Sequence, residues 1–241
     1  MYVGMPRLYP ILSEPCGVLA PVRLLVATGT LLLTLAAPAA AAPTMDPLKP
    51  CYVAAGEASN QRERIHVHAV GFTPAATVDL LFDGQHYATG HADINGTVVA
   101  DVPAPPQQFG QRPFTLTLQE LDNPANFVTK TSLVTHLSVT LRPKRARPSR
   151  KVRFSGRGFT LAKPVYGHYV FGGKVRKTIK LSRLPRQPCG TFHARRRQIP
   201  VRRPAVGDWL LQVDQQRRYS PHPASNVIPI LIRVRETVKA P

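Results

Sequence analysis

Apolar and polar residues alternate in short runs along most of this 241-residue chain. In residues 77–82, Val78, Leu80 and Phe82 fall on one face of an extended segment, while Thr77 and Asp79 fall on the other. Residues 114–119 alternate in the same way. A period of two is typical of a strand with one buried and one wet face, so the pattern predicts an all-β protein.

Turn residues separate these runs at intervals of roughly 8 to 12 positions, as in sandwiches and barrels. Seven short strands in a stretch of about 95 residues are typical of an immunoglobulin-like sandwich. The strands predicted for the first half are residues 51–54, 64–69, 77–82, 86–89, 96–102, 114–119 and 133–141.

The second half of the chain repeats the first. Residues 64–73 (RIHVHAVGFT) match residues 151–160 (KVRFSGRGFT), so a Gly-Phe-Thr corner occurs twice. In each corner, glycine lets the backbone bend and the following phenylalanine enters the core. The further matches are Asp83-Gly84 with Gly172-Gly173, Asn95-Gly96-Thr97 with Cys189-Gly190-Thr191, and Gly110 with Gly207. We therefore predict two tandem immunoglobulin-like β-sandwiches.

The repeated segment resembles the IPT/TIG-like modules of secreted bacterial proteins, in which V-x-G-x-G-F-x-P followed by D-G recurs. The resemblance extends over essentially the whole chain after residue 42. It implies a fold and an extracellular setting, and it carries no functional site. The second copy departs from it, since Leu161 stands where the first copy has Pro74, and it lacks Asp-Gly.

The first 42 residues have the pattern of a cleaved signal peptide. Arg7 and Arg23 precede an apolar core of 12 residues (24–35), and small residues at 36–42 suit signal peptidase. The alternative is an uncut anchor, which the core disfavours because a span needs about 20 apolar residues. We predict a first domain at 43–141, a basic Pro/Arg linker at 142–150, a second domain at 151–235 and a tail at 236–241. The protein is expected to be secreted or at the cell surface.

Charge divides the two halves. The net charge is +19, but residues 43–141 hold 5 basic and 9 acidic residues, whereas residues 142–241 hold 25 and 3. Such a field concentrates polyanions, so the expected partners are an anionic cell-wall polymer, a membrane surface, or nucleic acid in vitro. A solvated basic surface without a partner is the alternative. The candidate binding residues are Lys174, Arg176, Lys177, Lys180, Arg195, Arg196, Arg197, Arg202 and Arg203.

Known catalytic patterns are missing from the sequence: no nucleophile elbow, zincin helix, phosphate loop or dinucleotide fingerprint occurs. We therefore expect a non-catalytic binding or structural protein with no catalytic residue, cofactor, metal site or small-molecule substrate. The alternative is an extracellular enzyme or enzyme-accessory module on the sandwich scaffold. The sequence does not determine the oligomeric state.

Two cysteines, Cys51 and Cys189, follow the predicted leader. An even pair in an exported protein favours a disulfide. A linear tandem of sandwiches opposes it, because Cys51 would lie at the outer end of the first domain and a bond needs Cα atoms within about 7 Å. The rival to the disulfide is two separate thiols.

Overall fold

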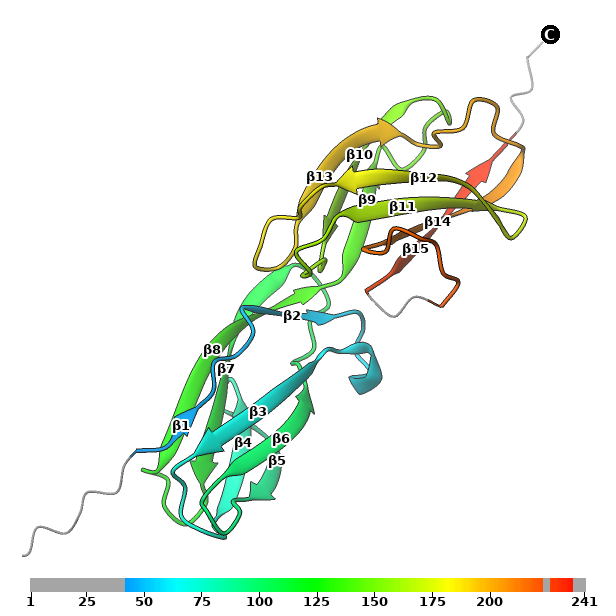
Figure 1. The fold of residues 1–241 in the computed structure, drawn as a ribbon. Helices are drawn as coiled ribbons and strands as arrows, with labels where there is room; N and C mark the ends of the chain where they lie inside the picture. Colours follow the sequence, from blue (N-terminus) through cyan, green and yellow to red (C-terminus); the bar gives the residue numbers. More distant parts are fainter. Residues whose placement is uncertain (1–41, 223–225, 236–241) are drawn as a thin grey trace, which may run out of the picture. The chain divides into compact units, whose positions relative to one another are not determined.

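The computed structural model describes residues 42–222 and 226–235. These residues form fifteen β-strands and one short 3-10 helix, Ser59–Gln61. The strands lie in four sheets around two separate apolar cores (Figure 1). The protein is therefore all-β, with two tandem immunoglobulin-like sandwiches, as predicted.

The first sandwich pairs a three-stranded sheet, ordered β1-β3-β6, with a five-stranded sheet, ordered β2-β8-β7-β4-β5. Apolar residues at alternate positions fill the space between the two sheets, as in β4 and β7. The strands are β1 (Thr44–Met45), β2 (Cys51–Ala54), β3 (Arg64–Val70), β4 (Thr77–Phe82), β5 (Gln85–His91), β6 (Val98–Pro103), β7 (Gln111–Glu120) and β8 (Phe127–His136).

The second sandwich has the same topology without a counterpart of β2 among its described residues. Its sheets are ordered β13-β10-β9 and β12-β11-β14-β15. Trp209, Tyr169 and Phe159 are among its largest buried side chains. The strands are β9 (Ser138–Arg142), β10 (Lys151–Arg157), β11 (Val165–Phe171), β12 (Lys174–Ser182), β13 (Phe192–Arg197), β14 (Gly207–Asp214) and β15 (Ile228–Val234).

The repeated Gly-Phe-Thr corner has the same geometry in both sandwiches. Gly71 and Gly158 have positive φ values of 96° and 89°, and the phenylalanines that follow them are buried. The amide of Phe72 donates to the carbonyl of Gly96, and the amide of Phe159 donates to that of Gly190. The internal repeat read from the sequence is thus a structural repeat.

The junction between the sandwiches lies earlier in the chain than predicted. The run 133–141 is two strands, because β8 ends at His136 in the first sandwich and β9 pairs with β10 in the second. Residues 142–150, predicted as a linker, belong to the second sandwich: the amides of Gln198 and Ile199 donate to the carbonyls of Arg150 and Pro148. A continuous apolar pattern through Leu137 concealed this break.

Two predicted features fall wholly or partly on residues that the structure does not describe. Residues 1–41 of the predicted signal peptide and the predicted tail, 236–241, lie outside the described ranges. The described ranges contain no helix that is long and apolar enough to cross a membrane. Residues 43–50, at the start of the predicted first domain, include β1, which pairs with β3.

Candidate functional site

One face of the β13-β10-β9 sheet carries cations at most of the outward positions of its central strand. Along β10, Val152 and Phe154 are buried in the core, so Lys151, Arg153 and Arg157 project from the opposite face. Strands β9 and β13 add arginines to the same face. We call this surface the cationic face, and its residues are Arg142, Lys151, Arg153, Arg157, Arg195 and Arg197.

The strand register places these cations directly opposite one another. Arg153 pairs with Arg142 of β9 on one side and with Arg195 of β13 on the other. The neighbouring row sets Lys151 opposite Arg197. Cβ atoms of directly opposed residues lie about 4.5–5.5 Å apart, and like charges at that distance destabilise the sheet.

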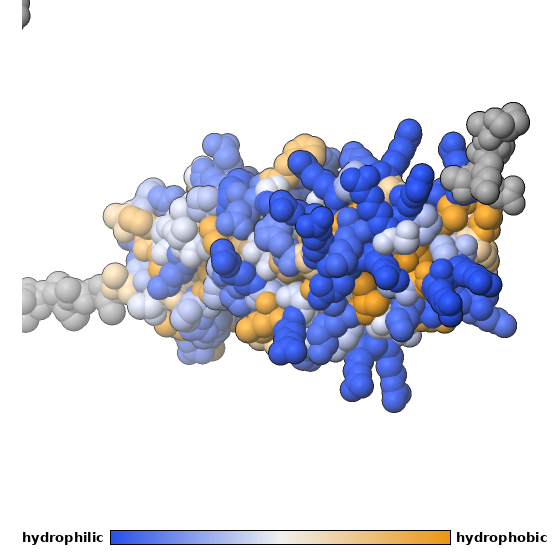
Figure 2. Space-filling view, turned by 90° about the horizontal axis from the view of Figure 1, so that it is seen from above, coloured by the Kyte–Doolittle hydropathy of each residue, from blue (hydrophilic) through white to orange (hydrophobic). Residues whose placement is uncertain are grey.

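No acidic side chain of the described residues neutralises this face. The two described acidic residues of the second sandwich, Asp208 and Asp214, are engaged elsewhere. Asp208 accepts from Arg233 at 2.7 Å, and Asp214 is fully buried beside His168. On the side of the molecule seen in Figure 2, strongly hydrophilic side chains gather over the second sandwich.

The structure brings some of the predicted binding residues together and separates others. Arg195 and Arg197 belong to the cationic face, whereas Arg196 occupies the position between them, which points to the other side of the sheet. Arg202 and Arg203 are exposed in the segment between β13 and β14. The remaining four lie on the edge strand β12 of the other sheet: Lys174, Arg176, Lys177 and Lys180.

Sequence reasoning missed four residues of the cationic face: Arg142, Lys151, Arg153 and Arg157. It grouped basic residues by their proximity along the chain, which favours clusters such as 195–197. The alternation in β10 (KVRFSGR) could have revealed Lys151, Arg153 and Arg157 as one outward row. The pairing of Arg142 with Arg153 depends on strand register, which the sequence did not reveal.

Strand β11, beside the basic strand β12, carries three aromatic residues, Tyr166, Tyr169 and Phe171, which could in principle stack on a ligand but are engaged in packing. Tyr169 is fully buried, and burial raises the pKa of its hydroxyl. Phe171 packs against Trp209 with ring centroids 4.9 Å apart, and Tyr166 stacks on His168. Their main contribution is therefore to packing.

A buried polar network crosses the other sheet of the second sandwich. His168 Nε2 lies 3.3 Å from Asp214 Oδ1 and 3.1 Å from the carbonyl oxygen of Gln216, so this nitrogen carries the proton. Its Nδ1 lies 2.9 Å from the hydroxyl oxygen of Thr178. Sequence reasoning singled out none of these contacts, because the partners lie on different strands.

The pKa of Asp214 reflects two opposing effects. Burial raises it, but the carboxylate accepts hydrogen bonds from His168, from the Gln212 amide at 2.8 Å and from the Gln216 backbone at 2.8 Å. These bonds hold the pKa below its ordinary value. Gln212 also donates to the carbonyl of Ser220, so the network fixes residues 216–220 against the sheet.

Cys51 and Cys189 form a disulfide with a Cα–Cα distance of 5.3 Å. The placement of Cys51 at the outer end of the first domain was wrong. Strand β2 pairs in parallel with the last part of β8, with Ala54 opposite His136, and so reaches the point where the chain enters the second sandwich. Tyr52 packs into the first core and Val53 into the second.

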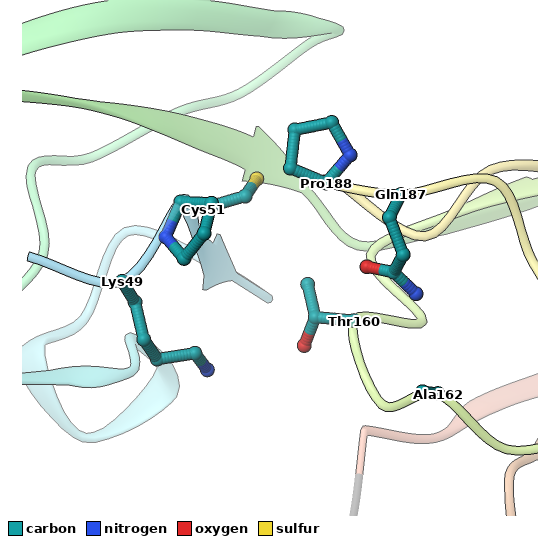
Figure 3. Close-up of a pocket in the computed structure, with 7 residues that line it drawn as sticks. Lys49, Cys51, Thr160, Ala162, Gln187 and Pro188 are labelled. Carbon is teal, nitrogen blue, oxygen red and sulfur yellow. The ribbon is translucent and has the colours of Figure 1, made fainter.

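A depression of about 300 Å³ lies beside this disulfide (Figure 3). Lys49 is the only charged group among its lining residues. Within the described ranges, no cluster of three or more His, Cys, Asp or Glu could hold a metal ion. The lining residues are Lys49, Pro50, Cys51, Thr160, Ala162, Gln187 and Pro188.

No protein-family model and no curated protein matches this sequence. Among solved structures, the chain is similar to the fibronectin(III)-like modules of Clostridium thermocellum CbhA (TM-score 0.25, 12% identity, covering 80% of this chain and 94% of that one). It is also similar to the human OSCAR ligand-binding domain (TM-score 0.31, 12% identity, covering 80% of this chain and 98% of that one). A third similar structure is that of a bacterial ice-binding adhesin, with a TM-score of 0.30 and 16% identity, covering 79% of this chain and 62% of that one. These neighbours are immunoglobulin-like or fibronectin(III)-like sandwich modules.

Proposed function

We propose that this protein is a non-catalytic binding module that acts outside the cytoplasm, and that its second sandwich binds polyanions through the cationic face. The row Arg142–Arg153–Arg195 is the observation that carries the proposal. Three like charges held side by side repel one another, and a bound anion relieves that repulsion. This repulsion destabilises the free protein, and a bound polyanion removes the destabilisation.

Two features support an extracytoplasmic setting. The first is the signal-peptide pattern of residues 1–42, and the second is the buried Cys51–Cys189 disulfide. Disulfides persist in oxidising compartments and are rare in the cytosol. The polyanions that such a protein meets are anionic wall polymers, anionic lipid surfaces and extracellular nucleic acid.

Salt-titrated binding tests the proposal. The probes are poly(glycerol phosphate), vesicles of equal parts phosphatidylglycerol and phosphatidylcholine, and duplex DNA. We expect at least one probe to bind at low ionic strength, with an affinity that falls linearly in a plot of log K against log salt. If the protein binds none of the three at low ionic strength, the proposal is wrong.

A matched pair of variants locates the contact. The substitutions Arg142→Ser, Arg153→Ser and Arg195→Ser remove three charges from the cationic face. Lys174→Ser, Arg176→Ser and Lys177→Ser remove three from β12. We expect the first triple variant to lower the salt slope, because it removes the contact with the phosphate that this row holds, and the second to lower it much less. Equal losses in both would show that net charge alone drives binding.

A further inference from the structure

We infer that the cationic face takes a linear phosphodiester polymer without nucleobases, lying along β10, with six backbone bonds between successive phosphates. This inference rests on the proposed function and narrows its ligand class. It follows from three properties of the face: the spacing of its rows, the chemistry of each row, and the absence of Phe, Tyr and Trp from its outward positions.

The rows of the face repeat every two residues of β10. Two residues of an extended strand rise about 6.6–6.8 Å and contain six backbone bonds. A polymer in which three carbons and two oxygens separate successive phosphorus atoms also has six backbone bonds per charge. When such a polymer is extended, the distance between its successive phosphates is close to the two-residue rise of the strand. One phosphate then lies over each row of the sheet.

Each row offers donors suited to a phosphate. The first row holds Lys151 and Arg197, and the second holds Arg153 between Arg142 and Arg195. Guanidinium groups bind phosphate in a bidentate fashion, so the second row provides the strongest contact.

The two remaining rows continue the same line. In the third, the Ser155 hydroxyl lies 3.0 Å from His193 Nδ1, and Thr140 stands on the other side of Ser155. The fourth row places Arg157 opposite Ser138. Hydroxyl, imidazole and guanidinium groups thus follow the two cationic rows, and the face provides positions for four consecutive phosphates.

The outward positions of this sheet carry no Phe, Tyr or Trp side chain. Its two phenylalanines, Phe154 and Phe192, are both buried in the core. Proteins that hold single-stranded nucleic acid stack bases on exposed aromatics. Because these outward positions are all polar or charged, they also lack the apolar groups that enter a lipid interface. The ligand is therefore read through its phosphates alone.

Charge exchange along a single strand tests the spacing without altering net charge. The double substitution Arg153→Ser with Ser155→Arg moves one guanidinium by one row, out of the arginine row and into the hydroxyl row. We expect it to weaken binding of poly(glycerol phosphate) about fivefold, which corresponds to about 1 kcal/mol. His193→Arg with Arg195→His makes the same shift on β13, and it serves if the first variant does not fold.

Probe chemistry provides the second arm. Inorganic polyphosphate has a much higher charge density, so simple electrostatics favours it over poly(glycerol phosphate) of equal charge number. We expect the reverse order, with poly(glycerol phosphate) bound more tightly. We also expect oligothymidylate to bind no more tightly than an abasic strand of the same length.

The outcomes separate this inference from the proposed function. Absence of binding to every polyanion at low ionic strength refutes the proposed function itself. Tighter binding of polyphosphate, or unchanged affinity in both exchange variants, refutes only the row spacing and leaves polyanion binding intact. A marked preference for oligothymidylate over the abasic strand refutes the claim that no base is read.

Discussion

Gly190 lies against the backbone of Phe159, the corner residue of the second sandwich. A Cβ atom at Gly190 would lie 2.0 Å from the carbonyl oxygen of Phe159, and its φ of 61° already disfavours other residues. Gly96 stands in the same relation to Phe72, with a corresponding distance of 2.1 Å. The close approach is needed because Phe159 donates its amide to the carbonyl of Gly190.

We predict that Gly190→Ala lowers the free energy of unfolding by about 3 kcal/mol, since the corner must open to admit the methyl group. Gly173→Ala is the control. It has a similar φ of 72° but no heavy atom within 4 Å of its added Cβ, so it should cost only about 1–2 kcal/mol for the left-handed backbone. Denaturant unfolding measures both variants. Equal losses would refute the steric role of Gly190.

The sequence was sufficient to predict this corner. Gly-Phe-Thr and the glycines facing it recur in both halves, so their equivalence could be recognised before their contacts were known. What the sequence could not reveal at this scale is the buried partner of a polar residue. Asp214 and His168 lie 46 positions apart, and only strand pairing shows that they touch.

Strand β14 carries one buried and one exposed aspartate, and the two illustrate how differently a carboxylate contributes. Asp214 joins β14 to β11 through His168 and to residues 216–220 through its remaining hydrogen bonds. Asp208 lies at the other end of the strand, where it pairs with the exposed side chain of Arg233. Hydrogen bonds inside the protein cost more to lose than surface ion pairs.

We predict that Asp214→Asn destabilises the protein by about 1–3 kcal/mol at pH 7. Because folding lowers the pKa of Asp214, its carboxylate stabilises the fold above the unfolded pKa, and this contribution disappears as the pH falls through the folded pKa. The gap between wild type and Asp214→Asn should therefore be smaller at pH 3 than at pH 7. Denaturant titration at the two pH values measures it.

Asp208→Asn is the matched control for this experiment. We expect it to cost less than about 1 kcal/mol at pH 7, because an exposed pair with arginine is screened by solvent. If the two substitutions destabilise equally, or if the Asp214→Asn gap does not shrink in acid, the buried network does not contribute as described.

At the scale of the elements, strands with strict alternation of apolar and polar residues could be predicted from the sequence. Which strands pair with one another could not. Val78, Leu80 and Phe82 show their buried face in the sequence, and the structure agrees. Strand β9 was missed because an apolar run passes through Leu137 without a turn residue, although the chain changes sandwich there. The cationic face was missed for a related reason, since register and not proximity along the chain brings Arg142, Arg153 and Arg195 together.

At the scale of the whole molecule, the Cys51–Cys189 disulfide links a strand of the first sandwich to the corner loop of the second. The two residues are 138 positions apart. Closing so long a loop restricts the unfolded chain, by about 5 kcal/mol in the chain-entropy model. Both cysteines are buried, and Val53 of the same strand packs into the second core, so native contacts surround the bond.

We predict that reduction, or the double substitution Cys51→Ser with Cys189→Ser, lowers the free energy of unfolding by about 4–5 kcal/mol. Guanidinium unfolding with and without reductant measures the loss, and the double variant should not respond to reductant.

Polyanion binding should behave differently. All six residues of the cationic face lie on strands of the second sandwich, which has its own core, so the salt slope should survive reduction as long as that sandwich stays folded. A reduced protein that keeps its second sandwich but loses the slope would show that the binding surface extends into the first.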